Sequence, residues 1–157
     1  MSKYQKKIVA QNKKARFNFT ILEQFEAGIV LRGTELKPIR ESRVNISESF
    51  AEFMHGELFL LNCHIAEYAK AGVFVHNPVR PKKLLLHKKQ VNKLIGAVKT
   101  QGQSIVPLSL YFNEKNRLKV EIALVGGKKL HDKRAAIKER EWNREKLALI
   151  KKRNQIN

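Results

Sequence analysis

Between residues 8 and 125 the chain is a succession of short apolar runs, each of strand length, and only one segment has the periodicity of a long helix. No Gly/Ser-rich or Pro-rich linker interrupts this stretch, so we expect it to fold as one unit. None of the runs approaches the roughly 18 residues that cross a bilayer, so we expect no membrane insertion. The pattern therefore favours a small, mainly β domain.

The first half of this stretch predicts strands around one short helix. Residues 17–33, FNFTILEQFEAGIVLRG, contain two β-branched and aromatic runs separated by a charged corner, and we interpret them as two paired strands. The following TELKPIRES predicts a short helix with Thr34 as its N-cap. Residues 44–65 then split at His55-Gly56 into two apolar runs, which favours a hairpin.

The second half predicts a loop, a helix and a closing hairpin. Residues 72–83 contain two prolines and end in basic residues, which is typical of a loop. Residues 84–102 predict a helix, because apolar side chains recur at helical spacing from Leu84 to Val98 and Gly102 follows as a C-cap. The runs SIVPLSLYF and RLKVEIALV flank the turn NEKN and predict a second hairpin.

The order of these elements indicates a fold class. Short strands, one mid-chain helix and two more strands match an OB-type Greek-key barrel, in which a helix follows the third strand. An SH3-like barrel or a split α+β sheet would produce a similar string, so these alternatives remain open. We therefore expect residues 1–125 to form a mainly β OB-type barrel with one or two helices, and residues 126–157 to form a basic tail.

The charge of the chain points to polyanionic partners. Lys and Arg number 32 against 14 acidic residues, giving a formal net charge of +18 and a pI near 10.2. Residues 126–157 contain 11 of the basic and 4 of the acidic residues, so the excess is shared by both parts of the chain. Two surfaces that face polyanions are therefore expected.

The cellular setting is expected to be the cytoplasm. The first 16 residues are basic but contain no apolar segment of the kind that marks a secretory signal. Cys63 is the lone cysteine and has no partner for an internal disulfide. We expect a monomer.

Four basic clusters favour nucleic-acid binding: NKKAR at 12–16, RPKK at 80–83, HKK at 87–89 and GKKLHDKR at 127–134. Any one cluster is more often a solubility feature, but four on so basic a chain favour contacts with phosphates. The candidate RNA-binding residues from the first three clusters are Lys13, Lys14, Arg16, Arg80, Lys83 and His87. A general OB-type single-stranded RNA-binding protein is one interpretation, and it would present stacking aromatics along exposed strand faces.

Catalysis has little support in the sequence. The five histidines are scattered, and Cys63 and His64 are adjacent, so they would point to opposite faces of a strand. Glu23, Glu26 and Glu35 have no histidine or second acid at a meaningful interval, and we interpret them as solvated turn and cap residues. A metal-dependent nuclease would need clustered acids. We therefore expect no enzyme activity, no cofactor and no metal site.

The C-terminal segment reads as a helix with little apolar surface to bury. From Asp132 onward, Trp142, Leu149 and Ile150 fall near one stripe, but Glu139 and Lys146 interrupt it. A helix of about 20 such residues is marginal alone in water. One interpretation is an ordinary helix packed on the barrel. The other is a segment that becomes helical on a polyanionic surface, with Trp142 as its anchor.

The whole chain, from about Ile8 to Trp142, resembles the SsrA-binding protein family, also called small protein B. The strings that carry the resemblance, in this order, are NKKAR, FEAGIVLRGTELK, VNISES, HNPVRPKKLLLH, VPLSLYF, GKKLHDKR and IKEREW. Ser42 stands where a glycine is common in the family, which puts the turn after the short helix in doubt.

The resemblance implies a function for the barrel. Family members bind the tRNA-like part of transfer-messenger RNA (tmRNA) and bring that RNA to ribosomes stalled on messages lacking a stop codon, without catalysing a reaction. By position, the RNA-binding face would include Asn12, Glu26, Leu85 and Lys119. Glu26 would accept hydrogen bonds, Leu85 would make an apolar contact and Lys119 would contact a phosphate.

The resemblance also implies a partner for the tail. In the family the tail is disordered in the free protein and becomes a helix in the empty messenger channel of the ribosome, downstream of the decoding centre. His131 would stack on a base of the decoding centre. The residues that would carry this step are Lys128, Lys129, His131, Asp132, Lys133, Arg134 and Trp142.

Overall fold

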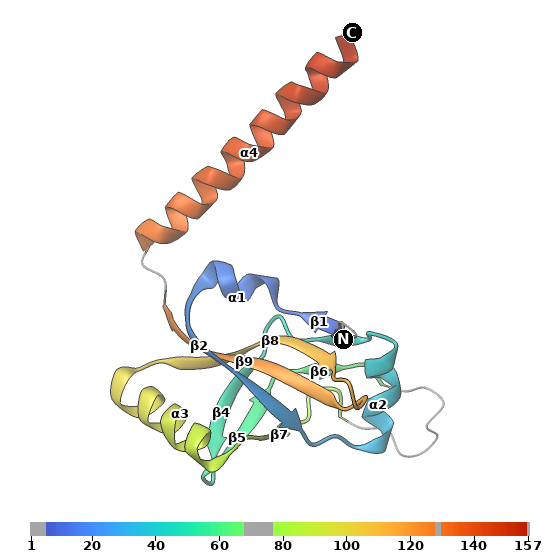
Figure 1. The fold of residues 1–157 in the computed structure, drawn as a ribbon, viewed down its shortest axis with the longest axis vertical. Coiled ribbons are helices and arrows are strands. Elements are labelled where there is room, and N and C mark those ends of the chain that lie inside the picture. Colours follow the sequence, from blue (N-terminus) through green and yellow to red (C-terminus); the bar gives the residue numbers. More distant parts are fainter. Residues whose placement is uncertain (1–5, 68–76, 128–129, 157) are drawn as a thin grey trace. The chain divides into compact units, whose positions relative to one another are not determined.

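The computed structural model describes residues 6–67, 77–127 and 130–156 (Figure 1). The chain divides into two compact units, Met1–Gly126 and Gly127–Asn157. The first holds the sheet and the shorter helices. The second holds the long helix α4, Leu130–Ile156.

Six strands of the first unit close into a barrel. The sheet has the order β1-β8-β4-β5-β7-β2-β9, and β8 pairs with β9 as well, which closes the strands from β8 to β9 into a ring. Strand β1, Lys7–Gln11, pairs with β8 outside this ring. The ring strands are β2 (Phe19–Ile29), β4 (Phe50–Met54), β5 (Glu57–Leu61), β7 (Lys82–Leu85), β8 (Ser104–Phe112) and β9 (Leu118–Gly127). The mainly β fold predicted from the sequence is confirmed.

Helices and a small second sheet complete the first unit. Its described residues contain three helices, one more than the largest number expected. They are α1 (Lys13–Asn18), α2 (Gly33–Arg40) and α3 (Lys88–Gln101). Strand β3, Val44–Asn45, pairs with β6, His64–Ile65, to form the second sheet.

The prediction of two paired strands in residues 17–33 is wrong. Residues 19–29 form one long strand, β2, which is preceded by α1. The charged stretch that we took for a corner lies within this strand. Phe25 and Ala27 face the core while Gln24 and Glu26 are exposed, so the polar residues mark the outer face of a continuous strand.

The boundary between the predicted loop and helix is also wrong. Residues 82–85 form strand β7, which pairs with β5 and β2, and α3 begins only at Lys88. Leu84 is 4% exposed and packs in the barrel core. Because β7 is an additional ring strand, α3 follows the fourth strand of the barrel and not the third. Gly102 caps α3 in the left-handed conformation, φ 62°, as predicted.

Both predicted hairpins are confirmed. In the β4–β5 hairpin Met54 pairs with Glu57, and His55 and Gly56 between them have positive φ angles. The β8–β9 hairpin turns at residues 113–117. Ser42 has a φ of 58°, a conformation that favours glycine, and so adopts the turn geometry that the sequence left in doubt.

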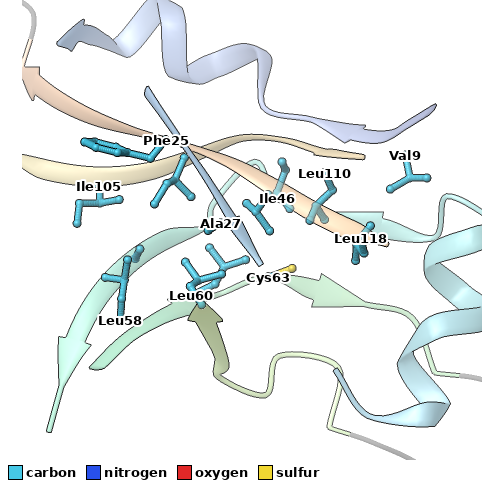
Figure 2. Close-up of a cluster of buried hydrophobic side chains, with 14 of the residues drawn as sticks. Val9, Phe25, Ala27, Ile46, Leu58, Leu60, Cys63, Ile105, Leu110 and Leu118 are labelled. Carbon is cyan, nitrogen blue, oxygen red and sulfur yellow. The ribbon is translucent and has the colours of Figure 1, made fainter. Parts of the chain in front are cut away.

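The core fills the interior of the ring (Figure 2). Most of it comes from inward-facing residues of the barrel strands, because successive side chains of a strand point to opposite faces. Ile39 of α2 and Leu94 of α3 pack into the same cluster. The close-up labels side chains from β2, β5 and β8 within one cluster: Phe25, Ala27, Leu58, Leu60, Ile105 and Leu110.

A buried ionic cluster ties α2 to the start of β7. The Glu35 carboxylate is fully buried and pairs with Arg80, with Nη2 2.5 Å from Oε1. Lys82 is also fully buried: its Nζ lies 3.8 Å from Glu35 Oε2 and donates to the carbonyls of Arg80 at 2.7 Å and Cys63 at 3.0 Å. The prediction that Glu35 is a solvated residue is wrong, because these two cations compensate its burial.

Burial shifts the titration of this cluster. Desolvation lowers the pKa of Lys82, against the opposing effect of Glu35. Desolvation likewise raises the pKa of the Cys63 thiol to about 11. Cys63 therefore remains a neutral, buried thiol at physiological pH.

The start of α2 differs from the prediction as well. Arg32, and not Thr34, is the N-cap, and its backbone N–H donates to Glu35 Oε1 at 2.7 Å. One carboxylate therefore caps the helix and also neutralises Arg80.

Replacing Glu35 should destabilise the whole first unit. In Glu35→Ala two cations lose their buried partner, so we expect the free energy of unfolding to fall by about 3–5 kcal/mol in urea titration. The matched control is Glu41→Ala, which removes an exposed pair with Arg43 at 3.9 Å and should cost about 1 kcal/mol or less. Equal losses in the two variants would contradict a structural role for the cluster.

Candidate nucleic-acid interface

One outer face of the barrel is centred on Gly28 of β2. Gly28 pairs with Leu85 of β7, and β9, which carries Lys119, lies on the other side of β2. A Cβ added at Gly28 would lie 3.3 Å from Leu85 Cβ and 3.8 Å from Lys119 Nζ. The absence of a side chain at Gly28 therefore lets the leucine and the lysine approach each other across β2. We call Glu26, Gly28, Leu85 and Lys119 the Gly28 face.

Glu26 is held in place on this face. It is exposed, and the hydroxyl of Tyr111 in β8 donates a hydrogen bond to its Oε2. Tyr111 itself is 1% exposed, and Lys6 Nζ lies 4.5 Å from the centroid of its ring. Glu26 is thus an oriented acceptor at the protein surface, next to a half-exposed Leu85.

Asn12 lies at a neighbouring position. Its side chain is buried, Nδ2 donates to the Pro107 carbonyl at 3.1 Å, and Oδ1 has no partner among the described residues. Asn12 lines a hollow of about 360 Å³ together with Glu121. Glu121 is two residues beyond Lys119 on β9 and faces the same side of the sheet, so this hollow adjoins the Gly28 face.

The basic residues of α1 surround Asn12. Lys13 and Arg16 are exposed and line the same hollow of about 360 Å³. Lys14 lines a second hollow of about 300 Å³ and forms an exposed ion pair with Glu48 at 3.2 Å. Such a pair contributes little to stability, so Lys14 can exchange Glu48 for another anion at small cost.

The structure does not leave Arg80 free to bind phosphate. Its side chain is 19% exposed, and Nη2 is committed to Glu35. It also donates to the carbonyls of Pro81 and Val30. The second basic cluster is therefore largely part of the interior, because Lys82 is buried as well.

The other two RNA-binding residues predicted near β7 are more accessible. Lys83 is partly exposed and pairs with Glu57 at 2.9 Å. His87 is exposed and is the N-cap of α3, two residues beyond Leu85. His87 is therefore placed at the edge of the Gly28 face.

The tail helix α4 has 27 residues and so is about 40 Å long. Its described side chains are exposed, including Arg134 and, at 66%, Trp142. His131, Asp132 and Lys133 belong to α4, but their side chains lie outside the described part of the chain. Lys128 and Lys129 lie outside the described residues altogether.

Two site classes have no counterpart in the described part of the chain. No group of three or more His, Cys, Asp or Glu side chains there is arranged to hold a metal ion. Within the same residues, no helix is both long enough and apolar enough to cross a bilayer.

Sequence reasoning missed Tyr111, the residue that orients Glu26. The two lie 85 positions apart, so no local pattern joins them. The closing hairpin held a partial signal, because its register pairs Tyr111 with Lys119. The predicted hairpin therefore places Tyr111 beside Lys119, but it gives no indication of the hydrogen bond between Tyr111 and Glu26.

Comparison with known proteins identifies the family to which the chain is similar. The model of the SmpB protein family matches residues 9–152. The SsrA-binding protein of Afipia carboxidovorans is 54% identical over 147 residues, which cover 94% of each chain. The SsrA-binding protein of Wolbachia sp. subsp. Brugia malayi is 56% identical over 144 residues, covering 92% of this chain and 97% of that one.

A solved structure agrees with these relatives. A chain from the structure described as "tmRNA-SmpB: a journey to the center of the bacterial ribosome" superimposes with a TM-score of 0.64 and 44% identity, and the match covers 81% of this chain and 92% of that one. The match between the family model and nearly the whole sequence, together with these identities, establishes that the chain belongs to the SmpB protein family.

Proposed function

We propose that this protein binds the tRNA-like domain of tmRNA and delivers it to ribosomes stalled on messages lacking a stop codon, the process of trans-translation. The observation that carries the proposal is membership of a family whose relatives are named SsrA-binding proteins and match nearly the whole chain. The role is that of an adaptor and requires no catalysis. A partner on the ribosome also implies a cytoplasmic protein.

The Gly28 face offers the contacts that structured RNA requires. Sequence-specific RNA recognition uses unstacked bases, ribose hydroxyls and phosphates. The Glu26 carboxylate, oriented by Tyr111, is placed to accept hydrogen bonds from a base or a ribose hydroxyl. Leu85 supplies an apolar surface and Lys119 a phosphate contact beside it.

The surroundings of α1 extend this interface. Asn12 Oδ1 accepts no hydrogen bond from the part of the chain that the structure describes, and Lys13 and Arg16 bring charge to the same hollow. Lys14, Lys83 and His87 add accessible cationic or polar groups at its edges. Arg80 takes no direct part in our proposal and instead orders the segment before β7 through Glu35.

The tail acts on a different surface. Its described large apolar side chains are exposed, so their burial does not stabilise the helix: Ile137, Trp142, Leu147, Leu149 and Ile150. A helix of this kind is selected by a partner that favours it. We propose that residues 126–157 enter the empty messenger channel of the ribosome. In that channel Trp142 and the basic residues would contact ribosomal RNA, and His131 would stack on a base of the decoding centre.

A general single-stranded RNA-binding protein is not favoured. That class needs aromatic side chains exposed along strand faces. Tyr111 and Phe112 are buried, at 1% and 3% exposure, and of the aromatics in the described strands Phe50 of β4 is exposed, at 38%. One exposed aromatic does not form the row that this class uses, and the relatives are named SsrA-binding proteins. Tyr111 orients Glu26 through its hydroxyl and is not exposed for stacking on a base.

Filling the space at Gly28 should weaken tmRNA binding. In Gly28→Val the added side chain crowds Leu85 and displaces Lys119, so we expect affinity for the tRNA-like domain to fall by about tenfold, about 1.4 kcal/mol, in fluorescence anisotropy. The matched control is Gly33→Val, since an added Cβ there meets nothing within 4 Å. Unchanged affinity in a folded Gly28→Val variant would count against the Gly28 face as the RNA-binding surface.

Changes at the start of α4 should separate RNA binding from ribosome engagement. We expect the triple variant Asp132→Ala, Lys133→Ala, Arg134→Ala to bind tmRNA nearly as the wild type does, and to abolish peptide tagging on stalled ribosomes. A charge-matched control, Arg140→Ala, Glu141→Ala, Arg144→Ala, should retain measurable tagging. Loss of tmRNA binding in the first variant would contradict the division between barrel and tail.

A further inference from the structure

A hollow next to the Gly28 face is lined by four cations, three of which, Lys6, Lys115 and Arg117, have no part in the contacts proposed above. Its volume is about 430 Å³. Lys6, Lys115, Arg117 and Lys119 line it together with two acidic residues, Glu26 and Glu114. Glu26 and Lys119 belong to both regions, so the hollow is continuous with the Gly28 face.

The cations of this hollow differ from three other lysines near the barrel surface. Lys14, Lys83 and Lys93 each pair with a carboxylate at 2.7 to 3.2 Å. Within the described residues, no carboxylate lies within ion-pair distance of the four cations that line the hollow. Four cations and two carboxylates line the hollow, so its net charge is positive, and an anion placed among these cations lowers their mutual repulsion.

One wall of the hollow carries the Glu26 carboxylate, whose position is set by Tyr111. The Tyr111 hydroxyl donates to the Glu26 carboxylate, which fixes the carboxylate at one side of the hollow and offsets part of its charge. Lys6 lies over the ring of the same tyrosine. Tyr111 thus positions an acceptor on one side and a cation on the other.

The turn that carries Lys115 and Arg117 is preorganised. Asn113 Oδ1 accepts from the backbone N–H of Lys115 at 3.0 Å and of Arg117 at 2.9 Å, and Asn113 N–H donates to the Arg117 carbonyl at 2.9 Å. Because the backbone is held, less conformational entropy is lost when these side chains bind a ligand.

We propose that this hollow binds a backbone phosphate of the same RNA strand that contacts the Gly28 face. The inference rests on the proposed function and deepens it, since it adds Lys6, Lys115 and Arg117 to the interface. A phosphodiester fits because the guanidinium of Arg117 can donate two parallel hydrogen bonds to its oxygens, while the lysines act as point charges. Lys119 joins this phosphate to the contacts at Glu26 and Leu85.

The salt dependence of binding tests the proposal. The double variant Lys115→Gln, Arg117→Gln should reduce the magnitude of the slope of log K against log salt by about 0.7 to 0.9 for the tRNA-like domain, since one phosphate contact is lost. The matched control, Arg40→Gln, Lys99→Gln, removes one arginine and one lysine that are exposed on α2 and α3. It should leave the slope within about 0.3 of the wild-type value.

The outcomes separate this inference from the proposed function. If the wild type shows no preference for the tRNA-like domain over unrelated structured RNA, the proposed function fails. If the preference is present but both double variants share one slope, the hollow is not a phosphate site. Arg117→Lys should keep the wild-type salt slope but weaken the affinity for the RNA, because the positive charge is retained while the two parallel hydrogen bonds of the guanidinium are lost.

A second experiment tests whether the ligand of the hollow is a phosphate of the RNA backbone or a free anion. Amide chemical shifts of residues 113–117 are followed by NMR during titration with inorganic phosphate at constant ionic strength, and then with the tRNA-like domain. We expect saturable shifts with the RNA alone. Saturation by millimolar inorganic phosphate would overturn the assignment to the RNA backbone.

Discussion

Closure of the barrel by strand β8 is the constraint on which the interface depends. β8 pairs with β1, β4 and β9, and its pairing with β9 turns a row of strands into a ring. Because the ring is closed, β2 is held between β7 and β9, which brings Gly28, Leu85 and Lys119 together. β8 also contributes Tyr111, whose hydroxyl orients Glu26. The same pairings thus organise both the core and the outer face.

The basic residues of this protein have two separate roles, which are to stabilise the fold and to face a polyanion. Arg80 and Lys82 belong to a sequence cluster that suggests phosphate binding, yet they neutralise the buried Glu35 and hold α2 against the start of β7. The cations around the β8–β9 turn have no such partner among the described residues and face solvent beside the Gly28 face. Position in the fold therefore decides which of the basic residues can bind RNA.

The sequence predicted features that depend on neighbouring residues. His55-Gly56, the NEKN turn and Gly102 were identified because turn and cap chemistry is local. The single long β2 and the short β7 were missed, because alternation around Phe25 resembles a charged corner and Leu84 fits a helical period equally well. Glu26, Leu85 and Lys119 came from family resemblance. The burial of Glu35 could not be predicted, since its partners lie 45 and 47 residues away.

The central claim is that the barrel reads the tRNA-like domain while the tail acts elsewhere. The most direct measurement is a ¹⁵N NMR map of the full chain with and without the tRNA-like domain of tmRNA. We predict that the shifted amides gather at Glu26, Gly28, Leu85 and Lys119, and that amides in residues 137–153 of α4 keep their free positions. Shifts concentrated in α4, with the Gly28 face unchanged, would contradict the account.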